Sequence, residues 1–211
     1  MLRTFIAIKV EASQALRRVL RTLGEMGRPV RPLDPNALHL TLRFLGQIDE
    51  AQVPGIVGAV EAAVETEAPF TMCIRGMGAF ADSRRPSIIW ADLEQPEPLY
   101  RIVGCLNDRL EVLGIGKDNR PWRAHLTLAR VKSAPPAELR NLLKSHGATP
   151  FATKVVDAVE LIGSDLRPSG PQYTVLASVV LSLDGKRIPA LRRPFQLCHT
   201  RRDSRFGSDT M

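Results

Sequence analysis

Alternating apolar and polar residues mark several segments of the chain as strands that bury one face. Such runs cover residues 2–10, 38–46, 70–74, 87–93, 122–131, 151–162 and 172–183. Apolar residues at helical spacing predict four helices, at about 14–23, 50–67, 99–113 and 135–146. Because the strands are not separated by one helix each, the pattern predicts an α+β fold with mixed or antiparallel sheets and outer helices.

One four-residue sequence occurs twice in this pattern, as residues 39–42 and as residues 125–128, and both read His-Leu-Thr-Leu. The chain has only four histidines, and two of them occupy the same place in the same alternation. Side chains two residues apart on a strand share a face, so each histidine shares a face with its threonine, opposite the leucines. Strict alternation adds Arg43 to the first face and Arg123 to the second. We therefore expect each strand to present an imidazole, a hydroxyl and a guanidinium.

The elements around the first copy are loosely repeated around the second. This predicts an internal duplication with a pseudo-two-fold axis, in which the two histidine faces meet in a central cleft. We expect residues 1–184 to form a single bilobal catalytic domain. Residues 185–211 contain seven lysines and arginines against two aspartates, so most of the net charge of +7 lies there. Such a composition predicts a basic, flexible tail rather than a dedicated nucleic-acid arm.

The composition is that of an ordinary globular protein, with 44% hydrophobic and 24% charged residues. The three cysteines are widely spaced and do not form a metal-site or disulfide pattern, which indicates a reducing compartment. The chain contains no 18-residue apolar run, and its first residues lack the long apolar stretch of a secretory signal. These features favour a cytoplasmic, monomeric protein without membrane contact.

Two facing imidazoles suit a reaction in which one proton leaves a nucleophile and another reaches a leaving group. Threonine hydroxyls can donate hydrogen bonds to phosphate oxygens, and arginine supplies positive charge. The pattern predicts phosphoester chemistry with no metal or other cofactor, because neither motif has a carboxylate or cysteine beside its histidine. The sequence also lacks the Gly-x-Ser-x-Gly elbow of many serine hydrolases. On the residues alone, two structural strand histidines explain the repeat equally well.

Residues 36–46 (NALHLTLRFLG) and 124–131 (AHLTLARV) resemble the paired His-x-Thr-x motifs of the two-histidine phosphoesterases. The sequence is most similar to the RNA 2′,3′-cyclic phosphodiesterase family, also called 2′-5′ RNA ligases. Residues 4–8, 78–90 and 165–171, followed by Tyr173, match this family in the same order. The resemblance covers about residues 1–184.

The resemblance implies a bilobal α+β fold and hydrolysis of a terminal 2′,3′-cyclic phosphate on RNA to a 2′-phosphate. By position, His39 would be the general acid for the 3′ oxygen and His125 the general base for water. The two roles are interchangeable in a pseudo-symmetric site. Thr41 and Thr127 would hold the phosphate. Arg130 matches the arginine that ends the second motif; since alternation places it on the leucine face, a bulge or strand end must turn it inward.

The residues themselves add further candidates for substrate binding. We add Arg43 and Arg123 as phosphate contacts, and Phe80 and Trp90 as aromatics able to stack on a base. Single aromatics beside strands are more often part of a core, so the two aromatics have a structural alternative. Ala124 precedes the second histidine, where the family usually has proline, which leaves the placement of that histidine less constrained.

Three hypotheses remain open at this stage. The first is a cyclic phosphodiesterase that acts on RNA ends, tRNA fragments among them. The second, in the same superfamily, is ligation or cleavage of 2′-5′ linkages, or a small cyclic nucleotide as the substrate. The third is a non-catalytic module that binds RNA ends. The intact pair of motifs argues against the third hypothesis, because binding alone does not require two proton-transfer groups.

Overall fold

The computed structural model describes residues 2–81, 86–94, 97–116, 121–167 and 170–182. The predicted tail, residues 185–211, lies outside this part of the chain. The helices described are α1 (Gln14–Glu25), α2 (Val53–Ala63), α3 (Glu97–Val112) and α4 (Glu138–Ser145). The strands described are β1 (Leu2–Lys9), β2 (Val30–Pro32), β3 (His39–Ile48), β4 (Phe70–Phe80), β5 (Ile88–Glu94), β6 (Leu126–Val131), β7 (Pro150–Val156), β8 (Ala158–Arg167) and β9 (Gly170–Val180).

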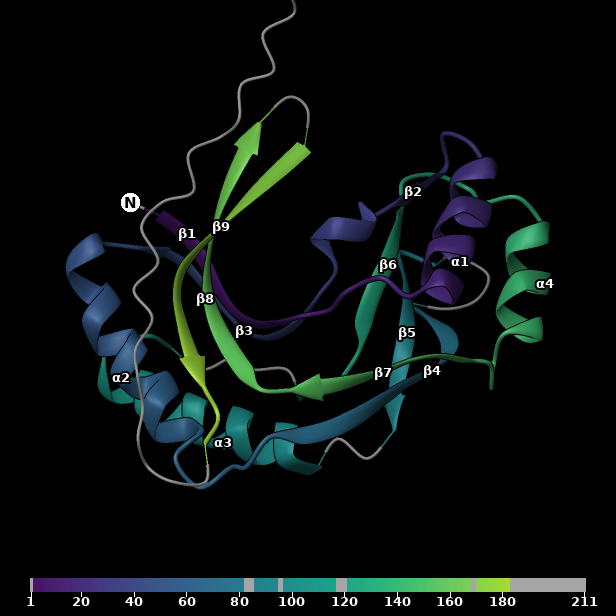
Figure 1. The fold of residues 1–211 in the computed structure, drawn as a ribbon. Coiled ribbons are helices and arrows are strands. Elements are labelled where there is room, and N and C mark those ends of the chain that lie inside the picture. The colour runs from purple at the N-terminus through teal and green to yellow at the C-terminus, as the bar shows by residue number, and fades with distance from the viewer. Residues whose placement is uncertain (1, 82–85, 95–96, 117–120, 168–169, 183–211) are drawn as a thin grey trace, which may run out of the picture.

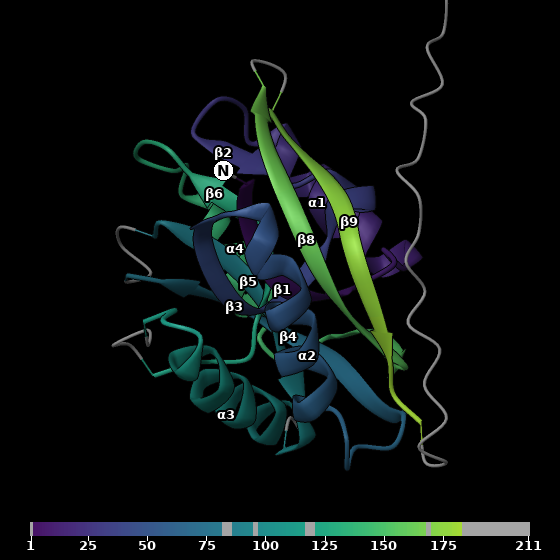
Figure 2. The ribbon, with the colours of Figure 1, turned by 90° about the vertical axis from the view of Figure 1, so that its left-hand side faces the viewer.

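The strands form two antiparallel sheets (Figure 1). One sheet has the order β3-β1-β8-β9, and the other has the order β2-β6-β5-β4-β7. Helices α1 and α4 contact the five-stranded sheet, whereas α2 and α3 contact each other and reach the four-stranded sheet. Figure 2 shows α2 and α3 side by side. The predicted α+β fold with two sheets and outer helices is confirmed.

The chain passes repeatedly from one sheet to the other. The first motif strand, β3, lies at the edge of the four-stranded sheet, and the second, β6, lies between β2 and β5 in the five-stranded sheet. Strands β7 and β8 are separated only by Asp157, yet they belong to different sheets. The two sheets are therefore interleaved along the sequence.

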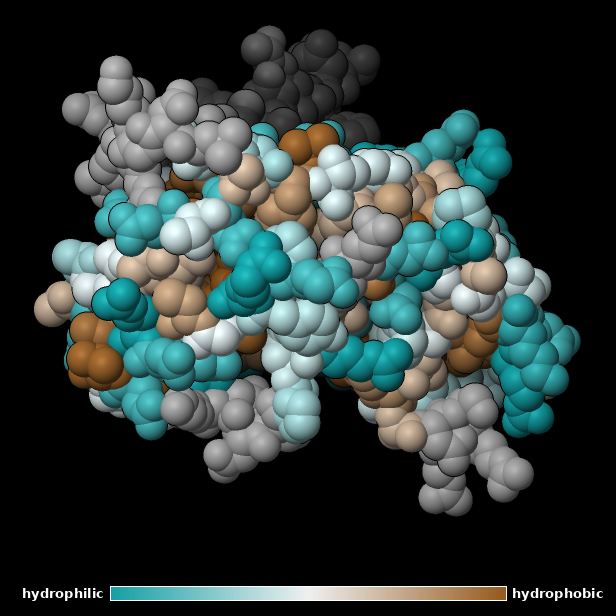
Figure 3. Space-filling model, turned by 90° about the horizontal axis from the view of Figure 1, so that it is seen from below, coloured by the Kyte–Doolittle hydropathy of each residue, from teal (hydrophilic) through white to brown (hydrophobic). Residues whose placement is uncertain are grey.

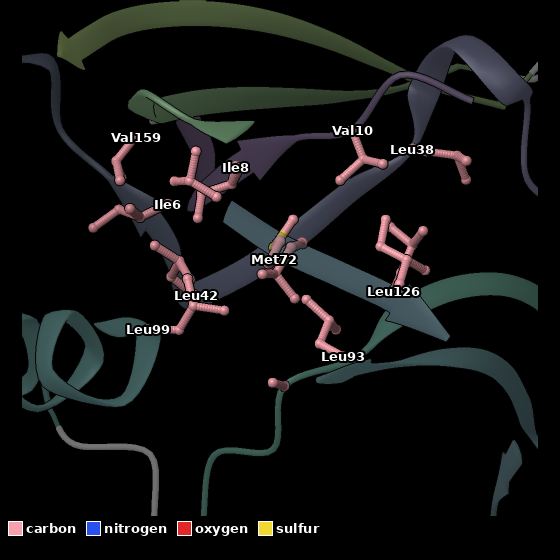
Figure 4. Packing of buried hydrophobic residues seen from close by; sticks show 14 of the residues in the cluster. Ile6, Ile8, Val10, Leu38, Leu42, Met72, Leu93, Leu99, Leu126 and Val159 are labelled. Atoms are coloured by element: carbon pink, nitrogen blue, oxygen red, sulfur yellow. The ribbon is translucent and has the colours of Figure 1, made fainter. Parts of the chain in front are cut away.

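One hydrophobic cluster joins the two sheets and all four of the described helices. Figure 4 shows side chains from both sheets around Met72 of β4, among them Ile8 of β1 and Leu126 of β6. Both leucines of each motif have an exposed fraction of 1% or less. Burying a leucine side chain contributes about 1.5–3 kcal/mol. The predicted leucine faces are thus the faces that hold the two motif strands in place.

The start of α1 connects that helix to the five-stranded sheet. The hydroxyl of Ser13 accepts a hydrogen bond from the backbone N–H of Leu16 at 3.1 Å and so caps the helix. The same hydroxyl donates to the carbonyl of Phe151 in β7 at 2.6 Å. Such a cap contributes about 1 kcal/mol of helix stability.

Several predicted boundaries differ from the structure. Val30–Pro32 forms a short edge strand outside the predicted strands, because it pairs with residues of β6 about 100 positions away. The strand predicted at 151–162 is two strands, β7 and β8. Strand β4 continues to Phe80 through Gly76, which has a φ of 80°, whereas the predicted strand ends at residue 74. Strand β6 begins at Leu126 rather than at residue 122.

In Figure 3, hydrophobic side chains reach the surface in small groups among hydrophilic ones. Within the described residues, no helix is long and apolar enough to cross a membrane.

We predict that Leu128→Ala lowers the free energy of unfolding by about 2–5 kcal/mol, because Leu128 has no exposed surface and the substitution leaves a cavity in the shared core. Urea denaturation followed by circular dichroism measures this change. Leu113→Ala is the matched control, since 41% of Leu113 is already exposed, and its expected cost is about 1 kcal/mol or less. Equal losses in the two variants would contradict the assignment of the leucine face.

Candidate active site

The local structure before β3 orients the first histidine. The carboxylate of Asp34 accepts a hydrogen bond from the N–H of Asn36 at 2.8 Å and caps a short 3-10 turn, Pro35–Ala37. Nδ1 of His39 lies 2.8 Å from the carbonyl oxygen of Ala37 in this turn. A carbonyl can only accept, so Nδ1 carries a proton and donates it. The other ring nitrogen, Nε2, is then the one available to a ligand.

The second motif repeats this arrangement. Nδ1 of His125 donates to the carbonyl of Arg123 at 2.8 Å, again two residues earlier in the chain. His125 lies immediately before β6, at the point where the strand leaves its loop. Both histidines are partly buried, with the same tautomer fixed by the same type of backbone bond. The structure therefore holds two imidazoles in equivalent orientations.

Both motif strands contain a pairing irregularity just after the threonine. In β3 the register shifts between Thr41 and Arg43, and in β6 it shifts between Thr127 and Ala129. A bulge inserts one residue and reverses the alternation of side chains beyond it. The duplication thus extends to the backbone of the two motifs.

The first bulge overturns one predicted site residue. Arg43 does not share the face of His39 and Thr41, because the bulge turns it towards the core side. Only 5% of Arg43 is exposed, and its guanidinium donates to the carbonyl of Gly116. Phe44 takes the histidine face in its place and is 63% exposed. The prediction of a guanidinium on the first face is wrong, and the residue there is an aromatic.

The second bulge has the opposite consequence. It turns Ala129 inward and leaves Arg130 exposed at the position equivalent to Phe44. The positive charge of Arg130 acts on both His39 and Tyr173, which belong to the other sheet. The predicted bulge is therefore present. It places a cation from the second motif close to the histidine of the first.

Aromatic side chains flank both imidazoles. The ring centroids of Phe5 and Tyr173 lie 4.8 Å and 5.1 Å from that of His39. Phe80 lies 4.8 Å from His125, in an edge-to-face arrangement. Phe44 extends the first group, at 6.0 Å from Phe5. The sequence does not indicate Phe44 as a neighbour of the site, because alternation places it on the leucine face, and Phe5 is predicted only as part of a buried strand.

The remaining predicted residues form one cluster beside His125. The guanidinium of Arg123 lies over the ring of Trp90 at 4.6 Å and near that of Phe80 at 5.9 Å. Arg123 also lies 4.0 Å from Asp92, and 54% of its side chain is exposed. Trp90 itself is only 7% exposed. The side chains of Arg123 and Phe80 are therefore accessible, whereas Trp90 is buried and packs against both of them.

Gly78 makes room for this cluster. A Cβ atom at this position would come within 2.3 Å of the indole ring of Trp90, so the ring lies directly on the glycine backbone. Among the described residues, no three histidine, cysteine, aspartate or glutamate side chains gather in a way that could hold a metal ion.

The surroundings of the two histidines keep both of them neutral at pH 7. Burial lowers the pKa of His39 from its ordinary 6.5; the bond to Ala37 partly opposes this effect, and the charge of Arg130 adds to it. Burial also lowers the pKa of His125, with Arg123 lowering it further through its charge and Asp92 raising it. Two neutral imidazoles with free Nε2 atoms are able to accept protons, and an anion bound between them would favour protonation.

The family model described as LigT-like phosphoesterase matches residues 6–90 and 92–173, and both motifs lie inside the matched segments. The chain belongs to this family. The family resemblance and the expectation of an enzyme are confirmed.

Relatives of this LigT-like phosphoesterase match most of its length. An RNA 2′,3′-cyclic phosphodiesterase of Thermus thermophilus is 32% identical over 159 residues, which cover 71% of this chain and 76% of that protein. One of Archaeoglobus fulgidus is 29% identical over 174 residues, which cover 82% and 96%.

Solved structures of related proteins show the same fold. A crystal structure of a protein from Thermus thermophilus has a TM-score of 0.69 at 29% identity and covers 85% of this chain and 97% of its own. E. coli LigT in complex with 3′-AMP has a TM-score of 0.67 at 23% identity and covers 86% and 98%.

We predict that the two arginines act on different histidines of this LigT-like phosphoesterase. Arg130→Gln raises the pKa of His39, because it removes a positive charge that disfavours the imidazolium. Arg123→Gln raises the pKa of His125 for the same reason. Titration of the imidazole C–H signals by NMR measures both values. Each variant is the control for the other. Equal shifts in the pKa values of His39 and His125 in either variant would contradict this arrangement.

Proposed function

We propose that this LigT-like phosphoesterase hydrolyses RNA ends that carry a 2′,3′-cyclic phosphate, and that the product is a 2′-phosphomonoester. The observation that carries the proposal is the pair of partly buried imidazoles, in each of which Nδ1 donates to a backbone carbonyl, so that Nε2 is the nitrogen directed to a ligand, with Arg130 acting on His39 from the other sheet. The names of the relatives from Thermus thermophilus and Archaeoglobus fulgidus support this substrate.

The reaction needs one base and one acid. Water attacks phosphorus while Nε2 of His125 takes a proton from it. The bond between phosphorus and O3′ breaks, and His39, protonated on both nitrogens, donates the Nε2 proton to O3′. The phosphate stays on O2′. We assign the acid to His39 because the exposed rings of Phe44 and Tyr173 lie on its side and offer a nucleoside apolar contact, which places O3′ there.

The charge on His39 depends on the bound phosphate. In the free protein, burial and the charge of Arg130 keep the imidazole neutral. A cyclic phosphodiester carries one negative charge, which offsets Arg130 and raises the pKa of His39. The substrate itself thereby converts this histidine into an acid. Thr41 and Thr127, one on each motif, are proposed to donate hydrogen bonds to the phosphate oxygens, and Arg130 to stabilise the developing charge.

The direct test is turnover of an RNA oligomer with a 2′,3′-cyclic end in the presence of EDTA, with the product identified by mass and by phosphatase sensitivity. The expected result is a 2′-phosphomonoester at an undiminished rate, because the proposed groups act without a metal. Turnover that requires added divalent ions would overturn the histidine mechanism. Tight binding without any product would identify an RNA-end-binding module instead.

We predict that His39→Ala and His125→Ala each lower kcat/KM by about 10²–10⁴, the range expected for loss of one general acid or base. Initial rates with the same RNA oligomer measure this effect. His146→Asn is the control: His146 stacks on Phe151 at the end of α4, away from both motifs, and its loss is expected to leave kcat/KM unchanged. Wild-type rates in either motif variant would exclude that histidine from proton transfer.

We also predict a bell-shaped pH dependence of kcat/KM with its maximum below pH 6.5. This parameter reports the free enzyme, in which the pKa values of both histidines are lowered from 6.5. The maximum of kcat is expected at higher pH, since the bound phosphate raises the pKa of the acid. Steady-state kinetics at about ten pH values between pH 4.5 and 9 separates the profile of kcat/KM from that of kcat. A kcat/KM maximum above pH 7 would contradict the depressed pKa values.

A further inference from the structure

The loop between α3 and β6 leads the chain into His125. Two hydrogen bonds connect this loop to β3, the strand that carries His39. The indole N–H of Trp122 donates to the backbone carbonyl of Thr41 at 3.0 Å. The guanidinium of Arg43, on the same strand, donates to the carbonyl of Gly116. These bonds join residues more than 70 positions apart and connect the edge of the four-stranded sheet to the loop that leads into β6.

The carbonyl of Thr41 is available because β3 is an edge strand. In an antiparallel pair, backbone groups of successive residues point alternately towards the partner and away from it. The N–H of Val10 donates to the carbonyl of Leu38, so the carbonyls of residues 38 and 40 face β1. The carbonyl of Thr41 therefore faces the open edge of the sheet. An indole N–H can only donate, which makes Trp122 a suitable partner for this edge carbonyl.

The orientation of the indole is fixed from α3. Tyr100 contacts Trp122 edge to face, with ring centroids 5.2 Å apart. Trp122 is half-buried and packs against the shared core. The side chain that bonds Thr41 is thus held by a ring contact on one side and by the core on another, which favours a single position.

A short path runs from this bond to the second histidine. Arg123 follows Trp122 directly, and its carbonyl accepts the Nδ1–H bond of His125. At the other end, Thr41 lies two residues after His39 on the same face of β3. The path thus joins the backbone of the first motif to the ring that is proposed to act as general base in the second.

We infer that Trp122 is a positioning residue, whose hydrogen bond to Thr41 sets the placement of His125 relative to His39. The kinetic consequence rests on the proposed function, because it requires both histidines to act on one phosphate. Misplacement of catalytic groups by about 1 Å costs about 100-fold in rate. A bond between the two motifs is suited to prevent such misplacement.

The decisive variant is Trp122→Phe, which keeps an aromatic ring against Tyr100, removes the N–H donor and reduces the volume of the side chain. The expected result is a kcat lower by about 10- to 100-fold, with KM changed by no more than about twofold, because Phe44 and Tyr173, the proposed contacts of the nucleoside, remain. Leu139→Ala is the control, since Leu139 is buried in α4 and its truncation leaves a cavity but keeps the bond from Trp122 to Thr41. It is expected to lower the melting temperature at least as much and to leave kcat within about twofold.

A second measurement does not depend on catalysis. Backbone hydrogen exchange, followed by mass spectrometry, is expected to become faster in Trp122→Phe both in β3 and in residues 121–131, and to stay unchanged in β3 in Leu139→Ala. A wild-type enzyme that turns over the RNA end, together with an unchanged kcat in Trp122→Phe, overturns the inference. A wild-type enzyme without turnover overturns the proposed function instead, and the exchange result then decides whether Trp122 holds the motifs together.

Discussion

Leu40 and Leu42 of β3 and Leu126 and Leu128 of β6 are buried in the same hydrophobic cluster, and this shared burial determines where the histidines lie. On a strand, fixing the leucine face also fixes the face that carries the imidazole and the hydroxyl. A slip of one residue in either strand would expose two leucines and bury a histidine, which is costly on both counts. The orientation of the site is therefore a consequence of core packing, secured before any ligand is bound.

The two bulges show how an internal duplication produces an asymmetric site. A bulge follows each threonine and turns the fifth residue after the histidine onto the face that carries the histidine. In the first motif that residue is Phe44, and in the second it is Arg130. The equivalent position thus holds an aromatic ring in one motif and a cation in the other, although aromatic rings flank both imidazoles.

The sequence alone predicts the fold class, the two motif strands and the faces of their first three residues, because these depend on local periodicity. Prediction from the sequence fails for features that depend on pairing between segments far apart in the chain. Periodicity does not reveal the bulge that moves Arg43 into the core, nor the division of residues 151–162 between two sheets. It likewise fails to indicate that Trp122 bonds the edge of β3. The turn of Arg130 off the leucine face could be predicted only because the family resemblance required a bulge, which the alternation by itself does not indicate.

The interleaving of the two sheets has a consequence for folding. The sequence repeat divides the chain near its middle, but neither half contains a complete sheet: β1 pairs with β8, β6 pairs with β2 and β5, and β7 pairs with β4. A fragment that ends between the motifs would leave strand edges unpaired on both sides. Many pairings also join distant positions, which slows folding because long loops close before their contacts form. The units that the duplication repeats are therefore not units that fold, because each sheet needs strands from both halves of the chain.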